Sequence, residues 1–170
     1  RAKDLPPELE AVVFAEQGPG RDRKVLGLTS LQRSLLGFDK AGVARTTLLI
    51  ERGEDPARLR SELPPKLADE IRFVTRQDGE SDVEALRRCV RPEARVVTWR
   101  SNVAIGPKDA DAIAHRPLED GRVLSVADGL VHVVSGHALR RFPVGSVLDL
   151  SRTLANQDAL DRMAEKVLVK

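Results

Sequence analysis

Near its start the chain reads Ala11-Val12-Val13-Phe14-Ala15, and a charged loop with two glycines, residues 16–24, follows directly. Such a short, continuous apolar run is typical of a strand buried on both faces of a parallel sheet. Behind the loop, Thr29 or Ser30 is placed to cap a helix with apolar residues at helical spacing, and Gly42 suits its end. The segment therefore predicts a strand, a loop and a helix in succession.

The same alternation continues along the chain. Pro64-Pro65 is expected to stop the second helix, and Ser81 with Glu84 has the spacing of a capping box at the start of the third. Strand–helix units of this kind predict parallel strands joined by helices on both faces of a sheet. The expected strands are residues 46–50, 71–74 and 95–99, and the expected helices are residues 55–63, 81–90 and 107–113.

The pattern changes after the fourth unit. Residues 123–127 and 130–134 flank Asp128-Gly129, a strong signal for two antiparallel strands joined by a tight turn. A short helix is expected near Gly136 and a final helix over residues 158–169. We therefore expect a three-layer α/β/α, Rossmann-like fold with a mostly parallel sheet and a β-hairpin late in the chain.

The composition is that of a globular protein. With 170 residues, 41% hydrophobic and 32% charged, residues 1–170 suit one domain, which we interpret as a segment of a longer protein because an amphipathic pattern continues to Lys170. A net charge of +2 and 3% aromatic residues argue against a nucleic-acid partner and a base-stacking surface. Cys89 has no partner for an intramolecular disulfide, and no apolar run approaches the ~20 residues of a membrane span, so a cytoplasmic location is expected.

Ligands of open α/β sheets bind beyond the carboxyl ends of the strands, so the loop after the first strand is a candidate phosphate site. Gly18 and Gly20 free the backbone to approach an anion, and Arg21 and Lys24 supply positive charge. The loop lacks the Gly-Lys-Ser/Thr of a P-loop and the third glycine of a dinucleotide fingerprint. A solvated surface loop is the alternative interpretation.

Three segments carry a resemblance to a known family. Residues 27–35 (GLTSLQRSL), 40–43 (KAGV) and 156–168 (NQDALDRMAEKVL) resemble segments of nucleotidyltransferases with the GT-A-like fold, and most of all the sugar-phosphate and inositol-phosphate cytidylyltransferases. Some members of that family are fused to a membrane CDP-alcohol phosphatidyltransferase. The resemblance implies transfer of a cytidylyl group from CTP to a phosphorylated alcohol, with Mg²⁺ as cofactor if the domain is active.

The family pattern also implies two metal-binding aspartates, which this sequence replaces. The first position falls at Ser101 and Asn102, and the second falls at Asn156, with Asp158 as a nearby substitute. Arg100 would repel a metal ion, since like charges about 4 Å apart cost about 4 kcal/mol at an effective dielectric constant near 20. We interpret the chain as a degenerate member in which Arg100 joins the loop cations in binding phosphate.

The sequence is compatible with three functions. The first is a cytidylyltransferase-like enzyme of CDP-alcohol and phospholipid biosynthesis, impaired because metal carboxylates are missing. The second is a non-catalytic regulatory or docking domain, a pseudoenzyme on the cytosolic face of the membrane that serves an attached transferase and forms a homodimer. The third is a sensor of nucleotides or small anions that uses the basic loop.

Other polar residues are expected to be structural. His132 is interpreted as a residue on a strand face, and Cys89 as a small core residue on a helix. The pairs Arg87-Arg88 and Arg140-Arg141 are expected to lie on solvated helix faces.

Overall fold

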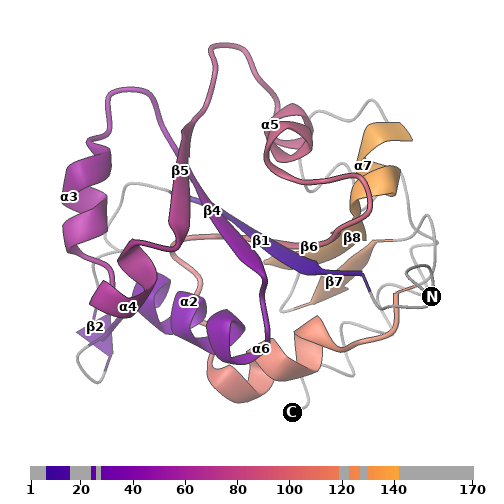
Figure 1. The fold of residues 1–170 in the computed structure, drawn as a ribbon, viewed down its shortest axis with the longest axis horizontal. Coiled ribbons are helices and arrows are strands. Elements are labelled where there is room, and N and C mark those ends of the chain that lie inside the picture. Colours follow the sequence, from indigo (N-terminus) through magenta and orange to yellow (C-terminus); the bar gives the residue numbers. More distant parts are fainter. Residues whose placement is uncertain (1–6, 16–23, 26–27, 119–122, 127–129, 142–170) are drawn as a thin grey trace.

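The fold is built on a six-stranded sheet with the strand order β5-β4-β1-β6-β8-β7 (Figure 1). The computed structural model describes residues 7–15, 24–25, 28–118, 123–126 and 130–141. Strands β5, β4, β1 and β6 run parallel, whereas β8 is antiparallel to β6 and β7 is antiparallel to β8. The late hairpin and the mostly parallel sheet expected from the sequence are confirmed.

Among the described elements, strands and helices largely alternate along the chain, with consecutive strands at β1–β3 and β7–β8 and consecutive helices at α3 and α4. The strands are β1 (Leu9–Phe14), β2 (Lys24–Val25), β3 (Leu28–Thr29), β4 (Arg45–Ile50), β5 (Ile71–Thr75), β6 (Arg95–Arg100), β7 (Leu124–Val126) and β8 (Val131–Ser135). The helices are α2 (Ser30–Lys40), α3 (Pro56–Ser61), α4 (Pro65–Ala68), α5 (Asp82–Cys89), α6 (Pro107–Ala114) and α7 (Gly136–Arg141). Strands β2 and β3 form a separate two-stranded sheet.

Helices cover both faces of the large sheet. Figure 1 shows α5 and α7 on one side and α2, α4 and α6 on the other. Each face has its own hydrophobic cluster, in which Trp99 of β6 stacks on Phe38 of α2 with ring centroids 4.5 Å apart, and Leu86 of α5 packs with Val12 of β1. Because successive strand side chains alternate between faces, the continuous apolar run of β1 fills both clusters.

Local signals for helix ends are confirmed where the structure describes them. The hydroxyl of Thr29 accepts a hydrogen bond from the Gln32 backbone N–H at 3.1 Å, and Ser81 accepts one from Glu84 at 3.2 Å. Gly42 follows α2 with a φ of 96°, a conformation that glycine adopts without the strain of a Cβ. These contacts fix where α2 and α5 begin and where α2 ends.

The expected stop at Pro64-Pro65 is wrong. Helix α3 already ends at Ser61, and Pro65 starts the short helix α4. A proline in the first turn of a helix loses no hydrogen bond, because that N–H has no partner within the helix. The two prolines therefore separate two helices instead of ending one.

Helix α7 follows the hairpin directly, and its first residue contacts the segment just before β6. Gly136 starts α7, and its backbone N–H donates to the Ala94 carbonyl at 2.8 Å. A Cβ at this position would overlap the carbonyl oxygen of Arg91 and lie 2.7 Å from that of Pro92, so only glycine permits this approach. The expected turn at Asp128-Gly129 and the expected helix over residues 158–169 lie outside the described residues.

Three of the four helix-face arginines, Arg88, Arg140 and Arg141, are exposed as expected, whereas Arg87 is only partly exposed. Arg87 and Arg140 also bind backbone carbonyl groups, which the sequence did not predict. Arg140 donates to the carbonyl of Val90 at 2.7 Å and to that of Arg87 at 3.2 Å, which ties α7 to the end of α5. Arg87 returns a hydrogen bond from its Nε to the carbonyl of Leu139. The two guanidinium groups satisfy carbonyl groups near the helix ends, where the backbone has no partner of its own.

Candidate functional site

The candidate site lies where the parallel strands end. Phe14 of β1 and Arg100 of β6 are paired in the sheet register, and the Ser101 backbone N–H donates to the Phe14 carbonyl at 2.8 Å. Arg76 follows β5 directly, and its backbone N–H donates to the Ile50 carbonyl of β4 at 2.9 Å. Four strands therefore deliver their last residues to one edge of the sheet, the edge at which open α/β folds bind ligands.

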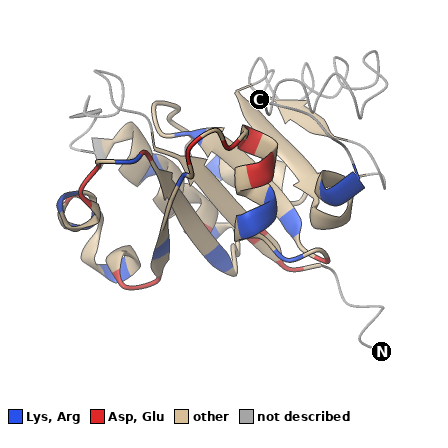
Figure 2. Ribbon diagram, turned by 90° about the horizontal axis from the view of Figure 1, so that it is seen from above, with Lys and Arg blue, Asp and Glu red and all other residues tan. Residues whose placement is uncertain are grey.

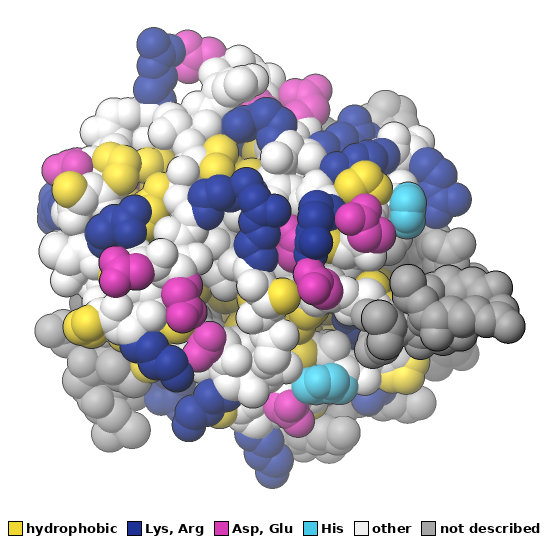
Figure 3. All heavy atoms as spheres, viewed as in Figure 1, with side chains coloured by type: hydrophobic (Ala, Val, Ile, Leu, Met, Phe, Trp, Pro, Cys, Tyr) yellow, Lys and Arg dark blue, Asp and Glu magenta, His cyan; other side chains and the backbone are white. Residues whose placement is uncertain are grey.

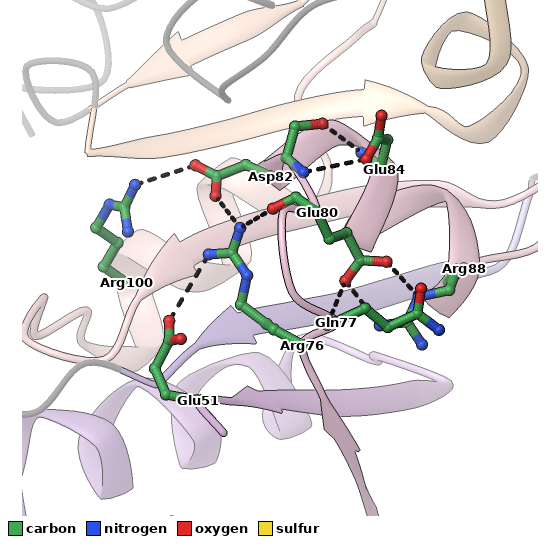
Figure 4. A network of polar contacts seen from close by, with 9 residues as sticks. Glu51, Arg76, Gln77, Glu80, Asp82, Glu84, Arg88 and Arg100 are labelled. Carbon is green, nitrogen blue, oxygen red and sulfur yellow. Dashed lines mark hydrogen bonds and ion pairs between the residues drawn. The ribbon is translucent and has the colours of Figure 1, made fainter. Parts of the chain in front are cut away.

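A carboxylate from α5 joins two arginines at this edge (Figure 4). Oδ1 of Asp82 lies 2.8 Å from Nη2 of Arg76, and Oδ2 lies 3.2 Å from Nη2 of Arg100. Glu51, which follows β4, lies with Oε1 at 3.8 Å from Nη1 of Arg76. We call Arg76, Asp82 and Arg100 the edge network.

An aromatic ring supports both guanidinium groups of the edge network. The guanidinium carbons of Arg76 and Arg100 each lie 5.5 Å from the ring centroid of Phe14. The ring is buried, and a cation above the face of an aromatic ring is stabilised by about 0.5–1 kcal/mol at exposed sites. Phe14 at the end of β1 therefore helps to place the guanidinium groups of Arg76, which follows β5, and Arg100, which ends β6.

The loop between β5 and α5 is held by its own ion pair. Arg88 donates from Nη2 to Oε1 of Glu80 at 2.8 Å, and Gln77 donates its backbone N–H to the same oxygen at 3.2 Å. The hydrogen bonds from Arg88 hold the pKa of Glu80 below its ordinary value, although burial opposes the shift. The loop that positions Arg76 and Asp82 is thereby fixed to α5.

The charged side chains of α5 are acidic at the start of the helix and basic at its end. Asp82 and Glu84 lie in the first turn of α5, and Arg87 and Arg88 lie in the last turn, as Figure 2 shows from above. This order complements the helix dipole. On the face of the molecule in Figure 3, the described Lys and Arg side chains are interspersed with Asp and Glu side chains. Positive charge is therefore offset locally as well as in the net count.

The structure describes only some of the residues predicted to bind phosphate or metal. Arg100 lies in the edge network, Ser101 is fully buried, and Asn102 is exposed in the turn after β6. Lys24 has its backbone in β2. The side chain of Lys24 lies outside the described part of the chain, as do Gly18, Gly20, Arg21, Asn156 and Asp158.

Sequence reasoning missed Arg76, Asp82 and Glu51. A usable signal was present, because Glu51 and Arg76 each follow a strand directly, as Arg100 ends one. Asp82 comes immediately after the capping residue Ser81, a position that places it at the same edge as the strand ends. The sequence does not show that these residues meet, because their contacts depend on the order of the strands in the sheet.

The described carboxylates do not fit the magnesium ion that the family resemblance implies. Magnesium binds hard oxygen ligands, usually carboxylates together with phosphates and waters. Asp82 lies near the end of β6, but both of its oxygens are bound by guanidinium groups. Among the residues that the structure describes, no group of three or more His, Cys, Asp or Glu side chains could hold a metal ion.

Two other residues have the structural roles expected of them. His132 is buried on β8, and its Nδ1 lies 2.7 Å from the hydroxyl of Ser125 on β7. Cys89 is buried in the cluster beneath α5, and burial raises the pKa of its thiol. Within the described ranges, none of the helices is long and apolar enough to cross a membrane.

No protein-family model matches the chain, and no curated protein matches it by sequence. Solved structures do match. The nucleotidyl transferase Mth528 of Methanothermobacter has a TM-score of 0.62 at 15% identity, with 90% of this chain and 84% of that chain covered. The inositol-1-phosphate CTP transferase of T. maritima has a TM-score of 0.58 at 14% identity, with 92% of this chain and 83% of that chain covered.

A third match is the Rv0371c protein of Mycobacterium tuberculosis H37Rv, solved in complex with manganese. Its TM-score is 0.59 at 17% identity, with 91% of this chain and 81% of that chain covered. The TM-scores of these matches establish a shared fold, whereas identities of 14–17% establish no shared activity, because one fold hosts more than one activity. The chain therefore has the mixed α/β, Rossmann-type fold of nucleotidyltransferases.

Proposed function

We propose that the chain is a cytidylyltransferase-like domain that binds CTP or a related nucleotide at the carboxyl edge of its sheet but transfers the cytidylyl group poorly. The observation that carries the proposal is the edge network, in which Arg100 ends β6 and pairs with Asp82. The fold shared with a CTP transferase supports nucleotide binding. The acceptor would be a phosphorylated alcohol.

Impaired transfer follows from charge. The reaction builds negative charge on the phosphates as pyrophosphate leaves, and a divalent ion usually stabilises that charge. The manganese complex of a structural neighbour makes metal use plausible for this fold, but the Asp82 carboxylate at the end of β6 is bound to Arg76 and Arg100. Guanidinium groups can hold phosphate oxygens without metal, so we expect binding to persist where catalysis is weak.

Calorimetric titration with CTP tests both halves of the proposal. We expect weak binding that changes less than about threefold, or less than about 0.7 kcal/mol, when Mg²⁺ or Mn²⁺ is added. Pyrophosphate release with inositol 1-phosphate as acceptor should be far below that of the T. maritima enzyme assayed in parallel. Strong metal-dependent binding with comparable turnover would contradict impairment, and an absence of any CTP binding would contradict the nucleotide site.

The variants Arg21→Ala/Lys24→Ala and Arg100→Gln then test which residues bind the phosphates. We expect each to weaken CTP binding, whereas Lys108→Ala, which removes an exposed cation from α6, should leave the affinity unchanged. Equal affinities in all variants would remove these residues from the site. The regulatory role beside an attached membrane transferase, with homodimer formation, remains a proposal from the sequence resemblance.

A further inference from the structure

Two guanidinium groups converge on a single carboxylate in the edge network. Arg76 takes one oxygen of Asp82 at 2.8 Å and Arg100 takes the other at 3.2 Å, so each oxygen has its own cation (Figure 4). Two guanidinium groups bind a phosphate or carboxylate ligand in the same way, with separate oxygens on separate donors. The arrangement is that of an oxyanion site whose oxyanion belongs to the protein.

Arg76 keeps its place without help from Asp82. Its Nη2 also donates to the backbone carbonyl of Glu80 at 3.0 Å, and its Nη1 lies 3.8 Å from Glu51. The ring of Phe14 lies under both arginines. These contacts do not involve Asp82, so we expect Arg76 to keep its position when the carboxylate is withdrawn.

The exposed fractions and charges of the edge-network side chains indicate how a ligand from solvent reaches the two arginines. The side chain of Arg100 is 45% exposed, whereas those of Arg76 and Asp82 are 17% and 11% exposed, so a ligand from solvent meets Arg100 first. The formal charges of Arg76, Arg100, Asp82 and Glu51 alone sum to zero. Withdrawal of the Asp82 carboxylate frees one N–H donor position on each arginine for the oxygens of an anion.

We propose that Arg76 and Arg100 form a binding site for a phosphoryl oxyanion, and that Asp82 closes this site until an incoming phosphate group displaces it. The proposal rests on the proposed function in one respect, namely that the carboxyl edge receives phosphorylated ligands. Beyond that function, it assigns Arg76 as a second phosphate-binding arginine and a closed state in which the Asp82 carboxylate occupies the site. Asp82 thus sets the affinity of the site by competition, because every bound oxyanion must replace the two ion pairs that it makes.

The test is calorimetry with inorganic pyrophosphate, and with inorganic phosphate as a smaller probe, at low ionic strength where exposed charges are least screened. Asp82→Asn should bind pyrophosphate at least about fivefold more tightly than the original chain, a gain at the low end of typical coupling effects. Asp78→Asn is the matched control, because it makes the same change of net charge in the same loop at a side chain that is 75% exposed. We expect no change in that variant.

Two double variants assign the donors. Adding Arg100→Gln or Arg76→Gln to Asp82→Asn should abolish the gain in pyrophosphate affinity. Equal gains in Asp82→Asn and Asp78→Asn, or a gain that survives the loss of either arginine, would overturn the proposal. Thermal unfolding establishes that each variant is folded, and Asp82→Ser, which keeps a small polar residue at the start of α5, provides a second way to remove the carboxylate.

Titration with CTP separates this proposal from the proposed function. CTP binding to the original chain without a pyrophosphate gain in Asp82→Asn would overturn the closing role of Asp82 and leave the nucleotide site standing. A pyrophosphate gain without CTP binding in any variant would support the oxyanion site and contradict the nucleotide function.

Discussion

Nη2 of Arg100 lies 3.2 Å from Oδ2 of Asp82, and this ion pair joins the end of β6 to the start of α5. The two residues are 18 positions apart in the sequence. A carboxylate therefore does lie beside the strand end at which the family resemblance places a metal-binding aspartate. It comes from another element, and it is already neutralised by arginine.

The two arginines of the edge network are expected to differ in their effect on stability. Arg100→Gln should lower the free energy of unfolding by less than about 1 kcal/mol, because a half-exposed ion pair is weak. Arg76→Gln should cost about 1–3 kcal/mol, since it removes the guanidinium donor from the Glu80 carbonyl and from Oδ1 of the mostly buried Asp82 carboxylate. Urea denaturation of both variants measures the difference, and a larger loss for Arg100→Gln would contradict it.

Gly136→Ala is expected to be severely destabilising. The added Cβ would overlap the Arg91 carbonyl oxygen, and backbone atoms cannot move aside as a flexible side chain can. We expect a loss of about 3 kcal/mol or more in the free energy of unfolding. Gly106→Ala is the control, because its Cβ meets only the Arg33 side chain at 3.5 Å, and it should cost less than about 1 kcal/mol. Similar unfolding midpoints for the two variants would contradict the close approach of α7.

The ion pair between Glu80 and Arg88 should make stability depend on acid pH. Because the pKa of Glu80 is lowered in the folded state, its stabilisation is complete above the unfolded pKa of about 4.3 and is lost as pH falls through the lower folded value. Glu80→Gln should therefore lose stability at neutral pH and show a flatter decline below about pH 4. Unfolding free energies measured from pH 7 to pH 3 test this, with the exposed Glu93→Gln as control.

Cys89 should react slowly with thiol reagents while the protein is folded. Burial both shields the sulfur and raises the pKa of the thiol, so less of the reactive thiolate is present at a given pH. Labelling at pH 8 should be at least about a hundredfold faster in denaturant than in buffer, as opening of the core is rare in a stable domain. Rapid labelling of the folded protein would contradict the burial of Cys89 beneath α5.

Local structure followed from local signals wherever neighbouring residues decide it. The capping spacing of Ser81 and Glu84, the position of Gly42 and the buried run of β1 each act within a few residues, and each is found in the structure. The two prolines after α3 are the exception. A proline ends one helix and starts another with the same fixed φ, so the pair alone does not say which of these occurs.

The edge network could be predicted only in part. Arg100 is predicted from the sequence because it lies just after the fourth expected strand, where the family pattern places a metal-binding aspartate, but its partner depends on which helix begins beside β6. The hydrogen-bond partners of Arg87 and Arg140 could not be predicted either. An arginine pair on a helix is usually solvated, but these two arginines donate to carbonyl groups at the ends of α7 and α5. Long side chains reach partners that sequence spacing does not reveal.

Strand and helix periodicity and composition alone predict the alternation of strands and helices, the late hairpin and a charge balance near zero. These features depend on periodicity and composition, which are properties of short segments. The contacts of Asp82 with Arg76 and Arg100, by contrast, depend on how the chain folds in three dimensions. The physical reason is that parallel strands joined by crossovers bring the ends of distant segments to one edge of the sheet, so the order of strands sets which charges become neighbours.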